Sequence, residues 1–377
     1  MRASVAPSVD VRRAAVIRAL RLLHTLARHP ATFATYSGHL LLAFCVVGTT
    51  SRHAATRRQA LLMGRERARR WQQGWNKTRR TLDADSVMHE AIASYAAKRM
   101  GIHDERIRSD IAAVLGRHTP RELLYFDASV EGPPDDVPED CACGRANARG
   151  RTACVVCGRR LMMLSRYEVW YYALTNVFFC ERIGTPLAVP FLDVLRHLAA
   201  LRPYPAAGAR DFYQSIYAVT HTVYTLNGYG QTRLSPRDFP QEVAFLKRSM
   251  NWAIEQEEPD TVGEIVDSLA AFGARDSDPA IVRGRTFLVD RQDEDGGWGD
   301  EDDDYRRFHH VWAAIDGLRD YRWRRCGVLA VRIRRALDSG VRSGGPLSRV
   351  GVNGSFVSGR RHRRRGRVMS SDISRRR

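Results

Sequence analysis

The sequence has few lysines, no long apolar run and no strand pattern, and each shortage excludes a class of protein. Only Lys77, Lys98 and Lys247 are lysines among its 60 basic residues, a bias typical of a GC-rich genome rather than of a selected surface. Polar residues and glycine interrupt the apolar stretch 31–50, and its longest unbroken part, Leu40–Val47, is far shorter than the ~20 residues of a membrane span. The 377 residues therefore predict an all-α protein in which 31–50 is a buried helix.

The net charge of +18 is concentrated at the two ends of the chain. Residues 1–80 carry a net charge of +14 and residues 340–377 a net charge of +10, which leaves the segment 81–339 acidic at −6. A groove that tracks phosphates needs its positive charge in the body of the domain, so we expect no nucleic-acid partner. The tail 339–377 is rich in arginine and glycine, has no apolar period, and is predicted to be disordered.

The first 30 residues predict an extension that precedes the main domain. Val11–His24 has the pattern of a basic amphipathic helix. It lacks the apolar core and small-residue cleavage site of a secretory signal, so we expect a cytoplasmic protein. The helix is either a solvated extra helix or a peripheral membrane contact.

Four of the seven cysteines form a cluster with metal-ligand spacing. Cys141 and Cys143 make one pair, Cys154 and Cys157 make the other, and each pair is followed by glycine. Two tight turns that present four thiolates suit a tetrahedral Zn²⁺ ion, and a complete ligand set makes that zinc structural. Two disulfides and four free thiols are the alternatives, and disulfides need an oxidising compartment. We expect a zinc-binding insert over 131–160, while the remaining cysteines are scattered and expected to be buried: Cys45, Cys180 and Cys326.

One pattern recurs along the chain: a His or a carboxylate opens an apolar segment and glycine closes it. Residues 85–101 align with 168–184 without a gap, and shorter copies cover 39–48, 221–230 and 264–273. A sixth copy, 310–319, lacks the closing glycine. Glycine is the usual residue just past a helix C-terminus, so the pattern predicts six inner helices.

More charged, amphipathic segments alternate with these six and predict outer helices at 54–76, 104–117, 187–201, 239–257, 277–291 and 324–338. Alternation of apolar and amphipathic helices is typical of helical hairpins that bury one face against the next hairpin. We therefore expect an (α/α)₆ toroid over 31–338, interrupted by the zinc insert. An open solenoid is the alternative arrangement.

Two adjacent motifs carry a family resemblance. Phe287-Leu-Val-Asp-Arg-Gln292, followed by Gly297-Trp298, resembles the QW-type repeat of squalene/hopene cyclases. The segment from Phe308 to Leu318 is similar to the start of an inner helix in protein prenyltransferase β-subunits. The resemblance implies an (α/α)₆ toroid with a central apolar cavity for an isoprenoid chain. It covers about 285–320 specifically and extends weakly over 33–338.

The repeat places a polar residue at the start of every expected inner helix: His39, Asp85, Glu168, His221, Glu264 and His310. If the ring closes, these side chains converge, and imidazoles with carboxylates ligate Zn²⁺ or Fe²⁺. We take His221, Glu264 and His310, from consecutive repeats, as the best catalytic and second-metal set. The alternative is that these residues only favour helix starts electrostatically. The prenyltransferase resemblance implies a zinc bound by Asp, Cys and His, and His310 matches that histidine, but no Asp-x-Cys precedes it.

A further candidate acid lies in the acidic run 293–304. Asp300-Glu301-Asp302-Asp303 fits the Asp-x-Asp-Asp string of protonating terpene cyclases, which makes Asp302 the general acid. A solvated acidic loop is the alternative, because eight of these twelve residues are acidic. Aromatic side chains on the inner segments are expected either to line an isoprenoid cavity or to form plain core: Trp170, Tyr171, Tyr172, Phe178, Tyr224 and Trp312.

The sequence thus predicts a terpenoid cyclase- or prenyltransferase-like enzyme of isoprenoid or secondary metabolism, with an apolar small molecule as its substrate. The alternative is a non-catalytic toroid that binds a peptide or a protein partner.

Overall fold

The computed structural model describes residues 6–75, 82–145, 147–148, 150–299 and 303–324. The predicted all-α class is confirmed, since helices form nearly all of the regular structure in this part of the chain. The elements are α1 Val9–Arg28, α2 Pro30–Thr50, α3 Ala54–Gln73, α4 Ala84–Arg99, α5 Glu105–Leu115, α6 Pro120–Leu124, β1 Val137–Pro138, β2 Met163–Leu164, α7 Arg166–Ile183, α8 Phe191–Leu195, the 3₁₀ helix η2 Arg196–Leu201, α9 Phe212–Asn227, α10 Pro240–Glu255, α11 Pro259–Ala271, α12 Pro279–Asp290 and α13 Asp304–Leu318.

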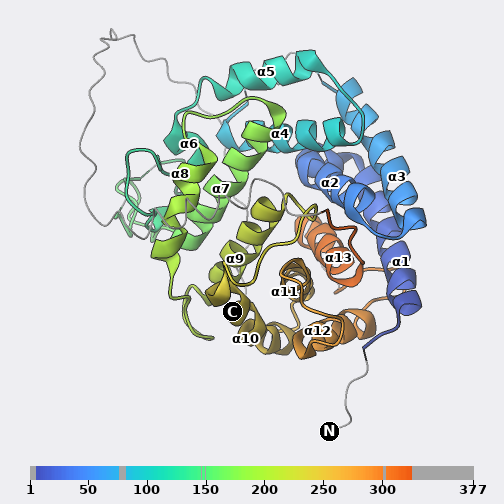
Figure 1. The fold of residues 1–377 in the computed structure, drawn as a ribbon. Helices are drawn as coiled ribbons and strands as arrows, with labels where there is room; N and C mark the ends of the chain where they lie inside the picture. Colours follow the sequence, from blue (N-terminus) through green and yellow to red (C-terminus); the bar gives the residue numbers. More distant parts are fainter. Residues whose placement is uncertain (1–5, 76–81, 146, 149, 300–302, 325–377) are drawn as a thin grey trace.

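Six helices form an inner set whose contacts run in a closed cycle. Along the chain, α2 contacts α4, α4 contacts α7, α7 contacts α9, α9 contacts α11 and α11 contacts α13, and α13 returns to contact α2. Figure 1 shows other helices around this set, with α5, α3, α1, α12 and α10 at the periphery. The inner helices contain the six expected apolar segments, so the alternation read from the sequence corresponds to inner and outer positions.

Whether a helix is an inner or an outer one follows from how its apolar residues are distributed around it. Most of α11 is buried around its whole circumference, from Pro259 to Leu269, whereas α10 and α12 bury one stripe each. Among the described residues, α2 has the length and composition to cross a membrane, with a mean hydropathy of 1.4, but 72% of that stretch is buried in the fold. A helix that is apolar all round is expected in a core as well as in a bilayer.

The first helix is part of this fold, which differs from the expected extension. The apolar face of α1, including Leu20 and Leu23, is fully buried, and α1 contacts α13, α2, α3 and α12. The face that a membrane-surface helix would present is therefore covered by protein. Residues 325–338 of the expected last outer helix, the tail 339–377 and Cys326 lie outside the described residues.

The glycines that close the repeat have the conformation that the sequence predicts. Gly184 caps α7 with a φ of 81°, and Gly101 and Gly273 follow α4 and α11 with a φ of 87° each. Only glycine adopts this left-handed conformation without a steric penalty. Gly48 is the exception, because it lies inside α2, where a Cβ atom would meet Leu61 at 2.8 Å.

The QW-type motif joins α12 to α1. Trp298 is 1% exposed, and its indole N–H donates to the carbonyl of Leu288 at 2.7 Å. The Gln292 amide donates to the carbonyls of Ala15 in α1 and of Gly296, both at 3.0 Å. In this chain, the motif therefore ties an outer helix to its neighbour.

The closest approach between inner helices is that of α11 and α13. A Cβ atom on Gly263 would lie 2.3 Å from the carbonyl oxygen of Ala313, and one on Gly317 would lie 3.0 Å from the Cα atom of Gly263. The two backbones are thus in direct contact, and neither glycine can be enlarged without moving a helix.

We predict that Gly263→Ala lowers the free energy of unfolding by about 3 kcal/mol, because the clash with rigid backbone outweighs the helix-propensity gain of ~1 kcal/mol. Gly132→Ala is the matched control, since a Cβ atom there meets nothing within 4 Å. Urea denaturation followed by circular dichroism measures both variants. Equal midpoints for the two would show that α11 and α13 are not in backbone contact.

Candidate functional site: a four-cysteine cluster and a central polar cavity

The four clustered cysteines converge as the sequence predicts. The Sγ atoms of Cys141 and Cys157 lie 3.4 Å apart, and those of Cys143 and Cys154 lie 3.6 Å apart. A disulfide would bring sulfurs to about 2.05 Å, so neither pair is bonded. A tetrahedral ion with metal–sulfur bonds of about 2.3 Å separates its sulfurs by about 3.8 Å, which is close to the observed distances. The cluster can hold a metal ion.

Two similar backbone turns build the cluster. After the first pair, Gly144 donates its N–H to the carbonyl of Cys141 and has a φ of 79°. After the second pair, Gly158 donates to the carbonyl of Cys154 and has a φ of 69°. Backbone N–H groups of the second turn lower the pKa of Cys154 to about 6, which favours the thiolate that a metal requires.

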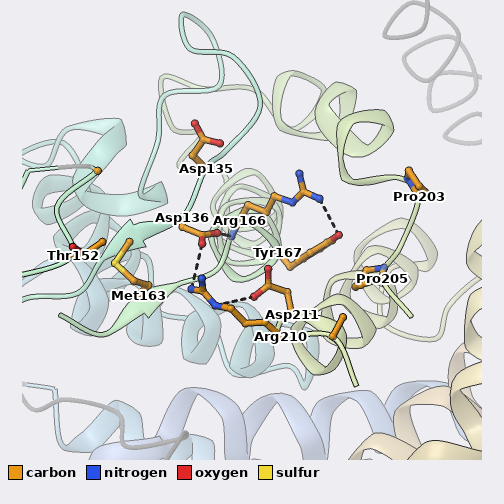
Figure 2. Close-up of a pocket in the computed structure, with 12 residues that line it drawn as sticks. Asp135, Asp136, Thr152, Met163, Arg166, Tyr167, Pro203, Pro205, Arg210 and Asp211 are labelled. Atoms are coloured by element: carbon orange, nitrogen blue, oxygen red, sulfur yellow. Dashed lines mark hydrogen bonds and ion pairs between the residues drawn. The ribbon is translucent and has the colours of Figure 1, made fainter. Parts of the chain in front are cut away.

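A groove of about 780 Å³ separates the cysteine insert from the ends of α7 and α9 (Figure 2). Three of its charged residues interact with one another: Arg210 lies 3.4 Å from Asp136 and 3.6 Å from Asp211. Asp136 also accepts the backbone N–H of Arg166 at 2.9 Å. None of the candidate catalytic residues lines this groove. The predicted chemistry must therefore be sought elsewhere.

The candidate residues meet instead in a cavity of about 70 Å³ at the centre of the inner helices. Its walls differ in character. On the side of α2, α4 and α7, the lining is mostly apolar: Leu42, Val46, Ile92 and Phe179. On the side of α9, α11 and α13, it is rich in groups that exchange protons: His221, Glu264, Asp267, His309 and Asp316. The cavity thus pairs an apolar wall with an acid–base wall.

Two of the four predicted catalytic residues, His221 and Glu264, lie together in this cavity. The Nδ1 atom of His221 is 4.0 Å from Glu264 and 2.9 Å from the carbonyl of Tyr217, to which it donates. This bond fixes the tautomer and leaves Nε2 as an acceptor. His39, the first member of the register, lines the same cavity.

The prediction placed His310 in the cavity beside His221 and Glu264. The histidine of α13 that lies there is the preceding residue, His309. His309 Nε2 lies 3.9 Å from Glu264, and its Nδ1 lies 3.5 Å from Asp260. His310 points away from the cavity, with Nδ1 3.4 Å from the carbonyl of Trp298 and Nε2 3.9 Å from Asp260. Neighbouring helical residues differ by about 100° in direction, so a shift of one residue changes the wall a side chain faces.

Other members of the expected register do not line the cavity. Glu168 belongs to a capping box with Ser165 at the start of α7, and Asp85 is exposed in the first turn of α4, where Tyr125 donates to it at 3.3 Å. For these two, the helix-start interpretation fits. Asp302 lies outside the described residues.

Burial sets the protonation of the acid–base wall. It raises the pKa of Glu264 to about 8, and it lowers the pKa of His221 to about 4. At neutral pH, Glu264 is therefore an acid and His221 a free base. Burial alone would lower the pKa of His309, but the hydrogen bond and charge of Asp260 raise it. Tyr217 also donates to Asp260, and Asp260 has a depressed pKa despite its burial, because both neighbouring histidines favour its ionised form.

A second set of ligand atoms lies beside this wall. Three possible ligand atoms lie within 4.8 Å of one another, one each from Glu258, Asp260 and His310. Asp260 and His310 are buried, at 5% and 3% exposed. The sequence analysis named His310 for a second metal site but missed both carboxylates. Glu258 directly precedes α11, and Asp260 is the second residue of that helix.

Comparison with known proteins gives one match. Residues 178–322 match the model of a domain of unknown function, DUF6895. No curated protein and no solved structure matches the chain. The matched segment includes α9, α11 and α13, which supply the acid–base wall, and it excludes the four-cysteine cluster.

We predict that Cys154→Ser removes one metal equivalent per chain, because three thiolates bind far more weakly than four. Cys45→Ala is the control, since Cys45 is buried in α2 and is remote from the cluster in sequence. Elemental analysis of the purified variants gives the stoichiometry. Equal metal content in both would contradict metal binding by the cluster.

Proposed function

We propose that this protein is an enzyme of the terpenoid cyclase and protein prenyltransferase kind, an (α/α)₆ toroid acting on an apolar, isoprenoid-type substrate. The observation that carries the proposal is the two-walled central cavity, in which apolar side chains of α2, α4 and α7 face His221, Glu264 and His309. The closed cycle of inner-helix contacts and the QW-type motif support the toroid.

The proposed reaction is a proton transfer to and from carbon. Glu264, protonated at neutral pH, donates its proton to a carbon–carbon double bond, and the cation that forms lies against the faces of Tyr224, Tyr305 and Trp312. Neutral His221 then removes a proton from a neighbouring carbon, which returns the substrate to neutrality as an isomerised or cyclised product. The proton passes from His221 back to the Glu264 carboxylate, 4.0 Å from Nδ1, which restores both groups for the next turnover. The Thr220 hydroxyl, which donates to Glu264 at 2.5 Å, holds Glu264 in place, and His309, paired with Asp260, lies 3.9 Å away.

The cavity volume sets a condition on this proposal. Sites that enclose a drug-sized ligand measure ~300–1,000 Å³, and the cavity measures about 70 Å³. A whole isoprenoid chain fits only if lining side chains such as Trp312 and Tyr305 move. Without that movement, the cavity admits only the reacting end of a substrate.

Product formation tests the proposal. We expect the purified protein to convert at least one member of a length series of isoprenoid alcohols and diphosphates, detected by mass spectrometry. Glu264→Gln should reduce turnover by ~10²-fold, because the amide has no proton to donate. Turnover should also fall about tenfold per pH unit above pH ~8, where Glu264 ionises.

The control is Glu105→Gln, since Glu105 has a side chain 71% exposed on α5. Turnover that is unchanged in Glu264→Gln, or an absence of turnover across the series, would refute the assignment.

We propose zinc as the metal of the four-cysteine cluster, in a structural role, because four thiolates fill its coordination sphere. Thiolates that bind metal must stay reduced, which favours a cytoplasmic protein. We propose the second metal, Zn²⁺ or Fe²⁺, at Glu258, Asp260 and His310, in place of the set with His221 and Glu264. Two carboxylates and one imidazole suit either ion and leave positions for water or substrate.

Metal analysis separates the two sites. Protein with Cys154→Ser should retain one equivalent of zinc or iron, and the additional substitution His310→Ala should remove it, because a carboxylate pair alone binds these ions weakly. His24→Ala is the control, since His24 lies on α1 and bonds Glu66. Retention of the second equivalent in the double variant would exclude this site.

A second candidate function is a non-catalytic scaffold that binds a peptide or a protein partner. The small cavity favours it, and so do Val155 and Val156, which are 50% and 68% exposed in the turn between Cys154 and Cys157. If the isoprenoid series gives no turnover, this candidate becomes the leading one.

A further inference from the structure

The end of the cavity near the last turns of α11 and α13 holds more acidic than basic groups. Glu264, Asp267 and Asp316 all line the cavity and are 4%, 3% and 6% exposed. The cation beside them, Arg319, is engaged with Asp316, to which its Nε–H donates at 2.6 Å, and with the hydroxyls of Thr50 and Ser51. His309 is paired mainly with Asp260. Arg319 and the Tyr321 hydroxyl also act on Asp267, but the hydrogen bonds of Arg319 go to Asp316, Thr50 and Ser51.

Asp267 also has an unused hydrogen-bonding atom in this cavity. Within the described part of the chain, its Oδ1 atom is buried and accepts no hydrogen bond. A buried acceptor without a donor is unfavourable by about the strength of a lost hydrogen bond, so such an atom points to a ligand donor. The raised pKa of Asp267, caused by burial and then by the nearby Asp316, is relieved when a positive charge approaches.

Aromatic rings complete the surroundings. Tyr224 and Tyr229 are stacked with ring centroids 5.9 Å apart, and both line the cavity together with Trp312. Aromatic faces attract cations, and this attraction is strongest where water is excluded. The opposite wall offers Leu42, Val46 and Ile92, which suit an alkyl chain.

We propose that this end of the cavity is a binding site for the primary ammonium group of an alkylamine, with Asp267 as the acceptor, Asp316 as additional negative charge, and the alkyl chain against the apolar wall. The proposal rests on the proposed function in one respect: it assigns an amine to the polar end of the apolar substrate. A cavity of about 70 Å³ has room for several water-sized groups, which matches a short alkylamine.

Three probes of equal apolar length test the proposal on the full chain: n-butylammonium, n-butanol and butyrate. We expect n-butylammonium to raise the melting temperature and to bind at least about tenfold more tightly than n-butanol, because a hydrogen bond to a charged group is added. Butyrate should not bind, since its negative charge would lie beside Asp267 and Asp316. Isothermal titration calorimetry gives the three affinities.

Asp267→Asn should weaken n-butylammonium binding by about tenfold or more and leave n-butanol binding unchanged. The control is Asp10→Asn, since the Asp10 side chain is 91% exposed on α1. Equal affinity for n-butylammonium and n-butanol in the unsubstituted protein would overturn the proposal even if Asp267→Asn did not fold. Stabilisation by Mn²⁺ alone, without stabilisation by n-butylammonium, would also overturn it and assign the carboxyl groups to a metal.

These outcomes are separate from those of the proposed function. Ammonium binding without isoprenoid turnover would refute the proposed reaction and keep the amine site. Isoprenoid turnover without ammonium binding would refute the amine site and keep the proposed reaction.

Discussion

A buried guanidinium joins the last inner helix to the end of the first. Arg319 follows α13, is 4% exposed, and donates from Nη1 to the hydroxyls of Thr50 and Ser51 at the end of α2. Its Nε–H bonds Asp316 one turn earlier, and its guanidinium lies 3.8 Å from the ring centre of Tyr321. A cation where two helices end is favoured by their dipoles, and removing one partner of a buried ion pair typically lowers stability by ~3–5 kcal/mol. This contact closes one end of the junction between α13 and α2, and at the other end Tyr305 and Phe308 pack against Tyr36. Only a closed cycle of helices encloses a central space.

The first helix reinforces this closure from outside. Arg12 in α1 donates to the carbonyl of Leu318 and to Asp320, both at 2.9 Å, and so holds the segment next to Arg319. The QW-type motif contributes through the bond from Gln292 to the carbonyl of Ala15. The four-cysteine insert is placed differently: it precedes α7 and is joined to that helix through β2, outside the inner cycle. A metal bound there would therefore organise a local loop, whereas the cavity is organised by contacts between the ends of the chain's described part.

Short-range features of the sequence predicted the structure well, and long-range ones did so less. The inner helices, the glycines at 101, 184 and 273, and the cysteine cluster follow from local backbone preferences and ligand spacing, which a sequence displays directly. The choice between His309 and His310 depends on a rotation of about 100° per residue, which the approximate register of the repeat does not resolve. The burial of α1 depends on contacts with α13, nearly 300 residues later, so its amphipathic pattern alone could not separate a packed helix from a surface helix. Asp260 and Asp267 were missed because they fall outside the repeat's first position, although each is one turn of α11 from Glu264.

The distribution of buried polar groups shows which part of the cycle is specialised. Burying carboxyl and imidazole groups lowers stability unless they are paired, and apolar side chains would fill the same space more favourably. The inner helices α2, α4 and α7 line the cavity largely with such apolar side chains, whereas α11 and α13 supply three carboxyl groups and a histidine. Gly263 and Gly317 let these two helices touch at the backbone, and this close approach is what brings His309 within 3.5 Å of Asp260 and 3.9 Å of Glu264. Larger residues at the two glycines would separate the helices and pull the histidine from both carboxyl groups. The small residues and the buried charges are therefore one arrangement, in which close backbone packing positions polar groups that are unfavourable to bury.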